Sequence, residues 1–269
     1  MVVYNRWQER AARREAQKAF AAAHSDVLLD GRREPSLHAR HDPAPPPKPR
    51  APSILADKVD YVIDLGFTRA TSPAELREGW SEIERRFARR VLLDEASPSH
   101  ARAALQLISR DGVIGDAELL EFRSMVETLG TRLGAVVRAP EMRTALDAAR
   151  ELDRTCADAD IQVALHVVGI GGAPAHFADQ GFHATPRDDG VTLTLDVART
   201  LQPGRTYEAM ARAGRQLAGA HGGRIVDDEG RELDERALAT IGRSIDAVRE
   251  RLAQCGIEPG SPLALRVFS

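Results

Sequence analysis

Two stretches of the chain share one order of apolar and polar positions. Residues 191–197 (VTLTLDV) alternate strictly between apolar and polar, which predicts a half-buried strand. A helix with apolar residues at helical spacing follows and ends at glycines 222–223, and residues 224–226 predict a short strand. A last helix begins near Asp234. Its apolar face is formed by Leu238, Ile241, Ile245, Val248 and Leu252. The predicted order is strand, helix, strand, helix.

The same order occurs earlier in the chain. Its strand, helix, short strand and closing helix are predicted at residues 103–109, 116–133, 134–137 and 141–156. The first strand begins 31 residues before Gly134 (134 − 103) and, in the later copy, 32 residues before Gly223 (223 − 191). One further apolar strand precedes each copy, at residues 61–67 and 161–168. We interpret this as a duplicated α+β unit; the alternative is two unrelated strand–helix runs.

The two copies differ after their first strand. In the earlier copy, Ser72 and Pro73 predict the start of a helix that runs to about residue 88. In the later copy, residues 169–174 predict a loop and residues 182–185 a short strand, with no counterpart of that helix.

The chain before residue 58 lacks the apolar positions of a folded core. Residues 1–23 predict a basic helix, and residues 24–57 a disordered linker with seven prolines between Pro35 and Pro52. The predicted domains are therefore residues 1–23, 24–57, 58–158 and 159–269.

Charge and composition exclude several classes of protein. The net charge is −3, which gives no global attraction to nucleic acid, although residues 1–50 carry ten Lys/Arg against six Asp/Glu. No run of about 18 apolar residues and no signal peptide is present. Two cysteines do not form a disulfide framework and fit a reducing compartment.

The first residues nevertheless have the composition of a segment beside a membrane. Trp7 and Tyr4 accompany five Lys/Arg between residues 6 and 18. We expect about 20 apolar residues to be encoded upstream of Met1; a soluble, frayed helix is the alternative.

No catalytic site, metal site or cofactor site is predicted. His166, His176 and His183 fall in one region, but their spacing is not that of metal ligands, and scattered surface histidines are the expectation. The glycines of residues 169–172 follow a strand, yet no helix starts there as a phosphate-binding loop requires. We therefore expect a binding protein and not an enzyme, with no small-molecule substrate and no nucleic acid partner.

Residues 190–197, the helix after them, residues 222–231 (GGRIVDDEGR) and the final helix together resemble the C-terminal domain of the ZipA-like bacterial cell-division proteins. Residues 4–10 and 256–269 are similar to that family as well, with the N-terminal membrane span absent from this chain. The resemblance implies a split βαβ fold, with helices on one face of an antiparallel sheet. It also implies a non-enzymatic adaptor that binds the C-terminal peptide of the division GTPase FtsZ and links it to the cytoplasmic face of the inner membrane. The family has both a helix and a strand after the first strand, and residues 169–189 are short for both.

The open face of this sheet is the candidate peptide-binding site. Alternation places Leu193, Leu195 and Val197 under the helices. The expected peptide contacts lie on the other face, at Gln162, Ala164, His166, Val168, Thr192 and Thr194. Because that face is polar, a second hypothesis is a cytosolic protein-interaction scaffold of two packed α+β units that does not bind FtsZ.

Overall fold

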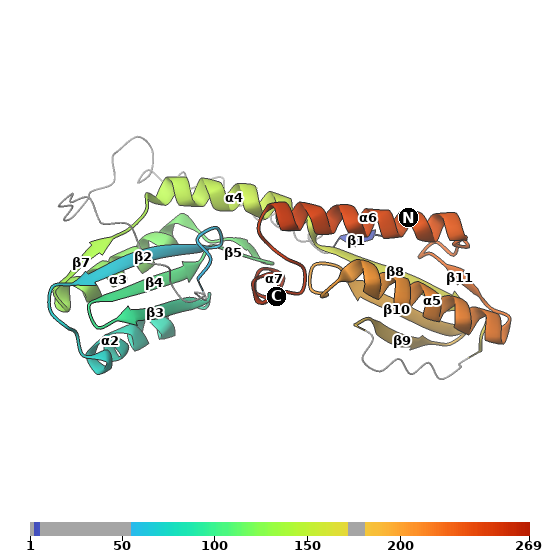
Figure 1. Cartoon of the computed structure of the whole chain (residues 1–269), viewed down its shortest axis with the longest axis horizontal. Helices are drawn as coiled ribbons and strands as arrows, with labels where there is room; N and C mark the ends of the chain where they lie inside the picture. The colour runs from blue at the N-terminus through green and yellow to red at the C-terminus, as the bar shows by residue number, and fades with distance from the viewer. Residues whose placement is uncertain (1–2, 6–54, 172–180) are drawn as a thin grey trace. The chain divides into compact units, whose positions relative to one another are not determined.

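The computed structural model describes residues 3–5, 55–171 and 181–269 (Figure 1). Two compact units divide the chain, and the division falls inside helix α4 (Met142–Ala159). We call residues 55–151 the first unit, and residues 3–5 together with 152–269 the second unit. Both combine an antiparallel sheet with helices, as the sequence predicts.

The first unit is built on a four-stranded antiparallel sheet in the order β3-β4-β2-β7. Its strands are β2 (Asp60–Phe67), β3 (Val91–Ser97), β4 (His100–Gln106) and β7 (Ala135–Arg138). The single strand predicted at residues 103–109 is interrupted: β4 ends at Gln106, and a small hairpin of β5 (Ile108–Ser109) and β6 (Gly112–Val113) follows. The side chain of Gln106 donates from Nε2 to the carbonyl of Ile108 at 2.7 Å, which supports this turn.

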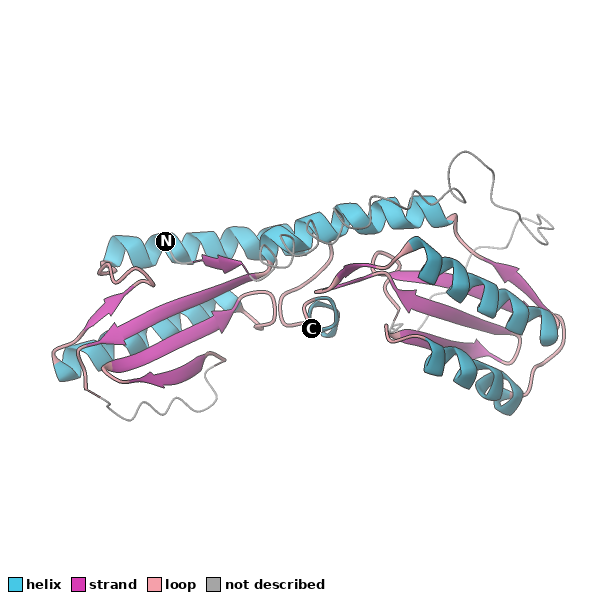
Figure 2. Cartoon of the chain, turned by 180° about the vertical axis from the view of Figure 1, so that it is seen from behind, coloured by secondary structure: helices cyan, strands magenta, loops and turns pink. Residues whose placement is uncertain are grey.

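Helices α2 (Pro73–Arg86) and α3 (Asp116–Arg132) lie on one face of that sheet (Figure 2). Helix α2 begins at the predicted Ser72 and Pro73, although the Ser72 side chain makes no capping hydrogen bond. Phe122 of α3 meets Trp80 of α2 edge-to-face with ring centroids 6.4 Å apart, and Phe87 at 5.6 Å. These aromatic contacts join the two helices over the sheet.

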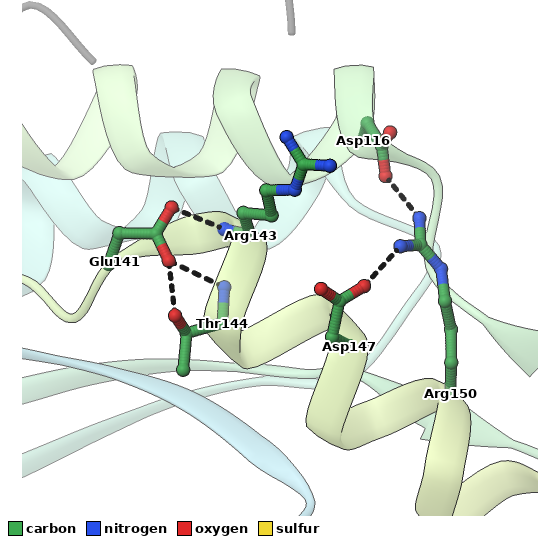
Figure 3. Close-up of polar contacts among 6 residues, drawn as sticks. All are labelled: Asp116, Glu141, Arg143, Thr144, Asp147 and Arg150. Atoms are coloured by element: carbon green, nitrogen blue, oxygen red, sulfur yellow. Dashed lines mark hydrogen bonds and ion pairs between the residues drawn. The ribbon is translucent and has the colours of Figure 1, made fainter. Parts of the chain in front are cut away.

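The start of α4 is fixed by side chains (Figure 3). The Glu141 carboxylate accepts hydrogen bonds from the backbone N–H groups of Thr144 (2.6 Å) and Arg143 (3.1 Å), and from the Thr144 hydroxyl. The Thr144 hydroxyl, followed by its N–H, lowers the pKa of the Glu141 carboxyl. Arg150 joins α4 to α3, because its guanidinium donates to Asp116 at 3.0 Å and to Asp147 at 2.9 Å.

The second unit repeats this arrangement. Its strands are β8 (Ile161–Val168), β9 (His183–Arg187), β10 (Gly190–Asp196) and β11 (Arg224–Val226). Its helices are α5 (Pro203–His221), α6 (Glu235–Gln254) and the short α7 (Pro262–Val267), which the sequence did not predict. The order β9-β10-β8-β11 is antiparallel throughout and matches β3-β4-β2-β7 strand for strand.

Register extends the correspondence to single residues. In the first unit, Ile63 lies opposite Ala103 and Leu65 opposite Val137; in the second unit, the matching pairs are Leu165 with Leu193 and Val167 with Ile225. All but Val137 are buried. Shared strand order, direction and register confirm the duplication predicted from the spacing.

One equivalence predicted from the sequence is wrong. Gly134 was expected to match Gly223, but its counterpart is Gly222. Gly134 lies three residues before Val137 and Gly222 three residues before Ile225, and these two strand residues occupy matched positions. The φ angles of the two glycines are +67° and +69°, a left-handed conformation that glycine adopts without steric cost.

The short strand predicted at residues 182–185 is present as β9, which pairs with β10. Residues 169–189, expected to be short for the family's helix and strand together, therefore do hold a strand. One expectation about the N-terminus needs correction. Residues 3–5 form strand β1, paired antiparallel with residues 161–163 of β8, so the helix predicted from Tyr4 does not include them. The rest of the predicted basic helix, and residues 24–54 of the predicted linker, lie outside the described residues.

No helix within residues 55–171 and 181–269 combines the length and apolar character that a membrane crossing requires.

Candidate functional site

The sheet of the second unit buries one face beneath its helices. Leu193, Leu195 and Val197 are fully buried, as the alternation predicts, and Val163, Leu165 and Val167 line up beside them on β8. Helix α5 approaches this face closely at Gly214, where an added Cβ would lie 3.3 Å from the Ile225 side chain. The Tyr207 hydroxyl donates to the Leu238 carbonyl at 2.9 Å and ties α5 to α6. Burial raises the pKa of Tyr207, which keeps this hydroxyl protonated.

The six predicted contact residues all lie on the opposite, open face. Antiparallel pairing sets Thr192 beside His166 and Thr194 beside Ala164, while Gln162 and Val168 lie opposite the two ends of β10. Cross-strand neighbours on one face are close enough to contact a single ligand. The geometry brings the six together; their role in peptide binding stays a prediction.

A polar network occupies the middle of this open face. His166 accepts or donates at both ring nitrogens: Nδ1 lies 2.8 Å from the Thr192 hydroxyl and 3.0 Å from the Arg187 guanidinium, and Nε2 lies 2.5 Å from the Asp228 carboxylate. Because a guanidinium only donates, Nδ1 is the acceptor, and the proton on Nε2 is donated to Asp228. His166 is 8% exposed, so the expectation of a surface histidine is wrong for this residue.

The turn after β11 places the Asp228 carboxylate within hydrogen-bond distance of His166. The neighbouring carboxylate of Asp227 accepts backbone N–H groups of Arg231 at 2.9 Å and Glu229 at 3.0 Å. These two hydrogen bonds, that from Arg231 first, lower the pKa of the Asp227 carboxyl. An ionised Asp227 therefore closes the turn, and the next side chain reaches over the sheet.

Several residues of this face were missed by sequence reasoning. Register with β10 places His183, Thr185 and Arg187 of β9 on it, and register with β8 adds Arg224 and Val226 of β11. The alternation of residues 183–187 is a usable signal once β9 is recognised. No local signal links Asp228 to His166, because 62 residues separate them.

The described residues offer little chemistry beyond binding. Among them, no three His, Cys, Asp or Glu side chains come together as a metal site, and His176 lies outside them. Burial raises the pKa of the Cys156 thiol to about 12, so this residue is a poor nucleophile. What the face does provide is a row of polar side chains, with His166 held among Thr192, Arg187 and Asp228.

Comparison with known proteins identifies the segment around this face. The family described as "ZipA, C-terminal FtsZ-binding domain" matches residues 175–244. The match confirms the resemblance predicted from the sequence. It spans β9, β10, α5, β11 and the first half of α6, and covers about a quarter of the chain (244 − 175 + 1 = 70 of 269 residues). No curated protein matches this chain.

Proposed function

We propose that this protein is a non-enzymatic cell-division adaptor whose second unit binds the C-terminal peptide of FtsZ on its open sheet face. The observation that carries the proposal is the match of residues 175–244 to an FtsZ-binding domain family. The matched segment supplies β9, β10 and β11. Strands β8 and β1 complete the sheet that carries the open face.

The open face favours a specific but moderate interaction. Ala164 and Val168 give small apolar surfaces, and Thr192, Thr194 and Gln162 add hydroxyl and amide groups that can bond a peptide backbone. Apolar burial here is limited, so affinity depends on how well these polar groups are paired in the complex. His166 is already held by three partners and keeps the centre of the face rigid.

We propose further that the N-terminal segment links the protein to the cytoplasmic face of the inner membrane. Five Lys/Arg between residues 6 and 18 accompany Trp7. Each Lys or Arg near anionic lipid contributes on the order of 1 kcal/mol, and Trp favours the interface. Attachment is either through this basic segment alone or through an apolar span encoded before it.

Peptide binding is tested with the full chain and a fluorescent peptide of the FtsZ C-terminus, titrated by fluorescence anisotropy. Thr194→Arg places a large charged side chain on the open face and should weaken binding at least about tenfold, equal to about 1.4 kcal/mol. Thr240→Arg, on the exposed side of α6, is the matched control and should bind like the parent chain.

Failure of the parent chain to bind the peptide would contradict the proposal and favour the cytosolic scaffold. Flotation with vesicles containing anionic lipid tests the membrane link separately. A chain that stays with the soluble fraction, and whose gene has a stop codon directly before Met1, would leave only the peptide-binding part of the proposal.

A further inference from the structure

Arg187 is a cation on the candidate face, and it forms no ion pair with a carboxylate among the described residues. One guanidinium nitrogen of Arg187 lies 3.0 Å from Nδ1 of His166 and donates to this neutral acceptor. Asp188 and Asp189 follow in the hairpin turn, yet neither forms an ion pair with Arg187 in the part of the chain that the structure describes. A guanidinium has five N–H donors, so most of those of Arg187 remain available to a ligand.

The contact with His166 nevertheless restrains the guanidinium of Arg187. Gly190 lies opposite Arg187 on β10 and has no side chain, so the arginine can extend across that strand toward β8. Glycine is required here, because an added Cβ would lie 1.8 Å from the Val167 carbonyl oxygen. At the far end, Asp228 accepts the proton of His166 Nε2 and so leaves Nδ1 free to accept from Arg187.

The exposed guanidinium of Arg187 therefore lies on the face with one N–H directed at His166, while its other N–H groups are open to solvent or to a ligand. Arginine pairs with carboxylates through two parallel N–H···O bonds, a geometry that ammonium and amide groups do not reproduce. A site that is organised before the ligand arrives loses less conformational entropy on binding. Both properties favour a carboxylate as the ligand group that pairs with the Arg187 guanidinium.

We propose that Arg187 is a specificity-determining residue that binds a carboxylate of the peptide, and that Asp228 positions it through His166. This inference rests on the proposed function, which supplies a C-terminal peptide as the ligand. The carboxylate has two possible sources with one chemistry: an acidic side chain or the α-carboxylate at the end of the peptide.

The test compares three forms of the FtsZ C-terminal peptide on the full chain by fluorescence anisotropy: the free acid, the C-terminal amide, and a form with every Asp and Glu changed to Asn and Gln. One of the two modified peptides should bind the parent chain more weakly, on the order of tenfold, as expected for loss of a charge-assisted hydrogen bond. Arg187→Gln should bind all three forms equally and weakly, since the group that distinguishes them is gone.

Asp228→Asn tests the positioning role. An asparagine amide can donate to Nε2 and move the histidine proton to Nδ1, which then no longer accepts from Arg187. The variant keeps the arginine, yet the difference in affinity between the free acid and the modified peptide that binds the parent chain more weakly should shrink. Arg212→Gln is the charge-matched control, because Arg212 is exposed on α5, on the helix side of the same unit.

The outcomes separate this inference from the proposed function. If the parent chain binds no form of the peptide, both fail. If it binds all three forms equally, or if Arg187→Gln keeps the preference for a carboxylate, the inference is overturned while peptide binding stands. Equal effects of Arg187→Gln and Arg212→Gln would also overturn it, because they would show only a general effect of net charge.

Discussion

The open sheet faces of the two units share one strand register, but their arginines differ in whether they pair with a carboxylate. His166, Thr192 and Thr185 of the second unit correspond by strand pairing to Asp64, Arg102 and Asp94 of the first. In the first unit, the Arg102 guanidinium donates to Asp94 at 2.6 Å, and His100 lies 3.3 Å from Asp64. In the second unit, Arg187 meets only a neutral imidazole among the described residues.

This difference concerns what each cation offers to a ligand. In the first unit, the Arg102 guanidinium already donates to a carboxylate of the same sheet. A positioned cation with a neutral partner keeps donors for a ligand from outside. The duplication therefore preserved strand order and the buried face, whereas the open face diverged, and only the second unit carries the family match.

The largest expected effect comes from exchanging core residues between the units. Leu193 and Ala103 occupy matched, fully buried positions. Leu193→Ala should cost about 2–5 kcal/mol of unfolding free energy through the cavity it leaves, and Ile241→Ala should fall in the same range. Ala103→Leu should cost about 1–3 kcal/mol by overpacking. Denaturant unfolding measures all three, and unchanged stability of both truncations would show that the buried faces are wrongly assigned.

The next effect is on the internal ion pair of the first unit. The Arg102 side chain is 11% exposed, so Asp94→Asn should cost about 1–2 kcal/mol by weakening a charge-assisted hydrogen bond. Glu95→Gln is the control: it removes an exposed pair with Arg77 and should cost less than about 1 kcal/mol. Equal costs for the two variants, measured by thermal unfolding, would argue against a special role for the Asp94–Arg102 pair.

A smaller effect is expected from giving the second unit a charge pair like that of the first. Thr185→Asp introduces a carboxylate at the position equivalent to Asp94, two residues from Arg187 on the same face of β9. The new pair should remove the preference for a carboxylate peptide, on the order of tenfold, with little change in stability. Anisotropy titration with the same three peptide forms provides the measurement; a preference that survives would mean that Arg187 does not bind the carboxylate.

The smallest effect concerns acid pH, through one carboxylate in each unit that accepts hydrogen bonds from two backbone N–H groups and has a lowered pKa. Folding lowers the pKa of Glu141 in the first unit and of Asp227 in the second. Each carboxyl therefore stabilises the folded state above its ordinary pKa, and this contribution is lost as pH falls through the lowered value. Glu141→Gln and Asp227→Asn should slightly lower the midpoint of thermal unfolding at neutral pH. As pH decreases, that midpoint should decrease less in these variants than in the parent chain. A parallel shift at every pH would contradict this linkage.

Local patterns were enough to predict most elements of both units. Element boundaries are marked through short-range geometry by Ser72 and Asp234 at helix starts, by the alternation of residues 191–197 and by the glycines before β7 and β11. Strand β3 is less evident from local pattern, because only its first residues are apolar while its pairing with β4 continues through Asp94 to Ser97. Pairing with a neighbouring strand, which a single segment does not reveal, determines where such a strand ends.

The sequence by itself determined the repeated order of elements and the buried face of residues 191–197, and it placed the six candidate residues on the other face, because alternation and helical spacing depend on neighbours along the chain. Only the tertiary structure decided what those residues meet. Arg187 and Asp228 reach His166 from 21 and 62 residues away. Such contacts depend on strand register and on the path of one turn over the sheet, and both are set by packing between distant segments. For that reason the sequence predicts where a ligand can bind, and the folded unit determines which chemistry it meets there.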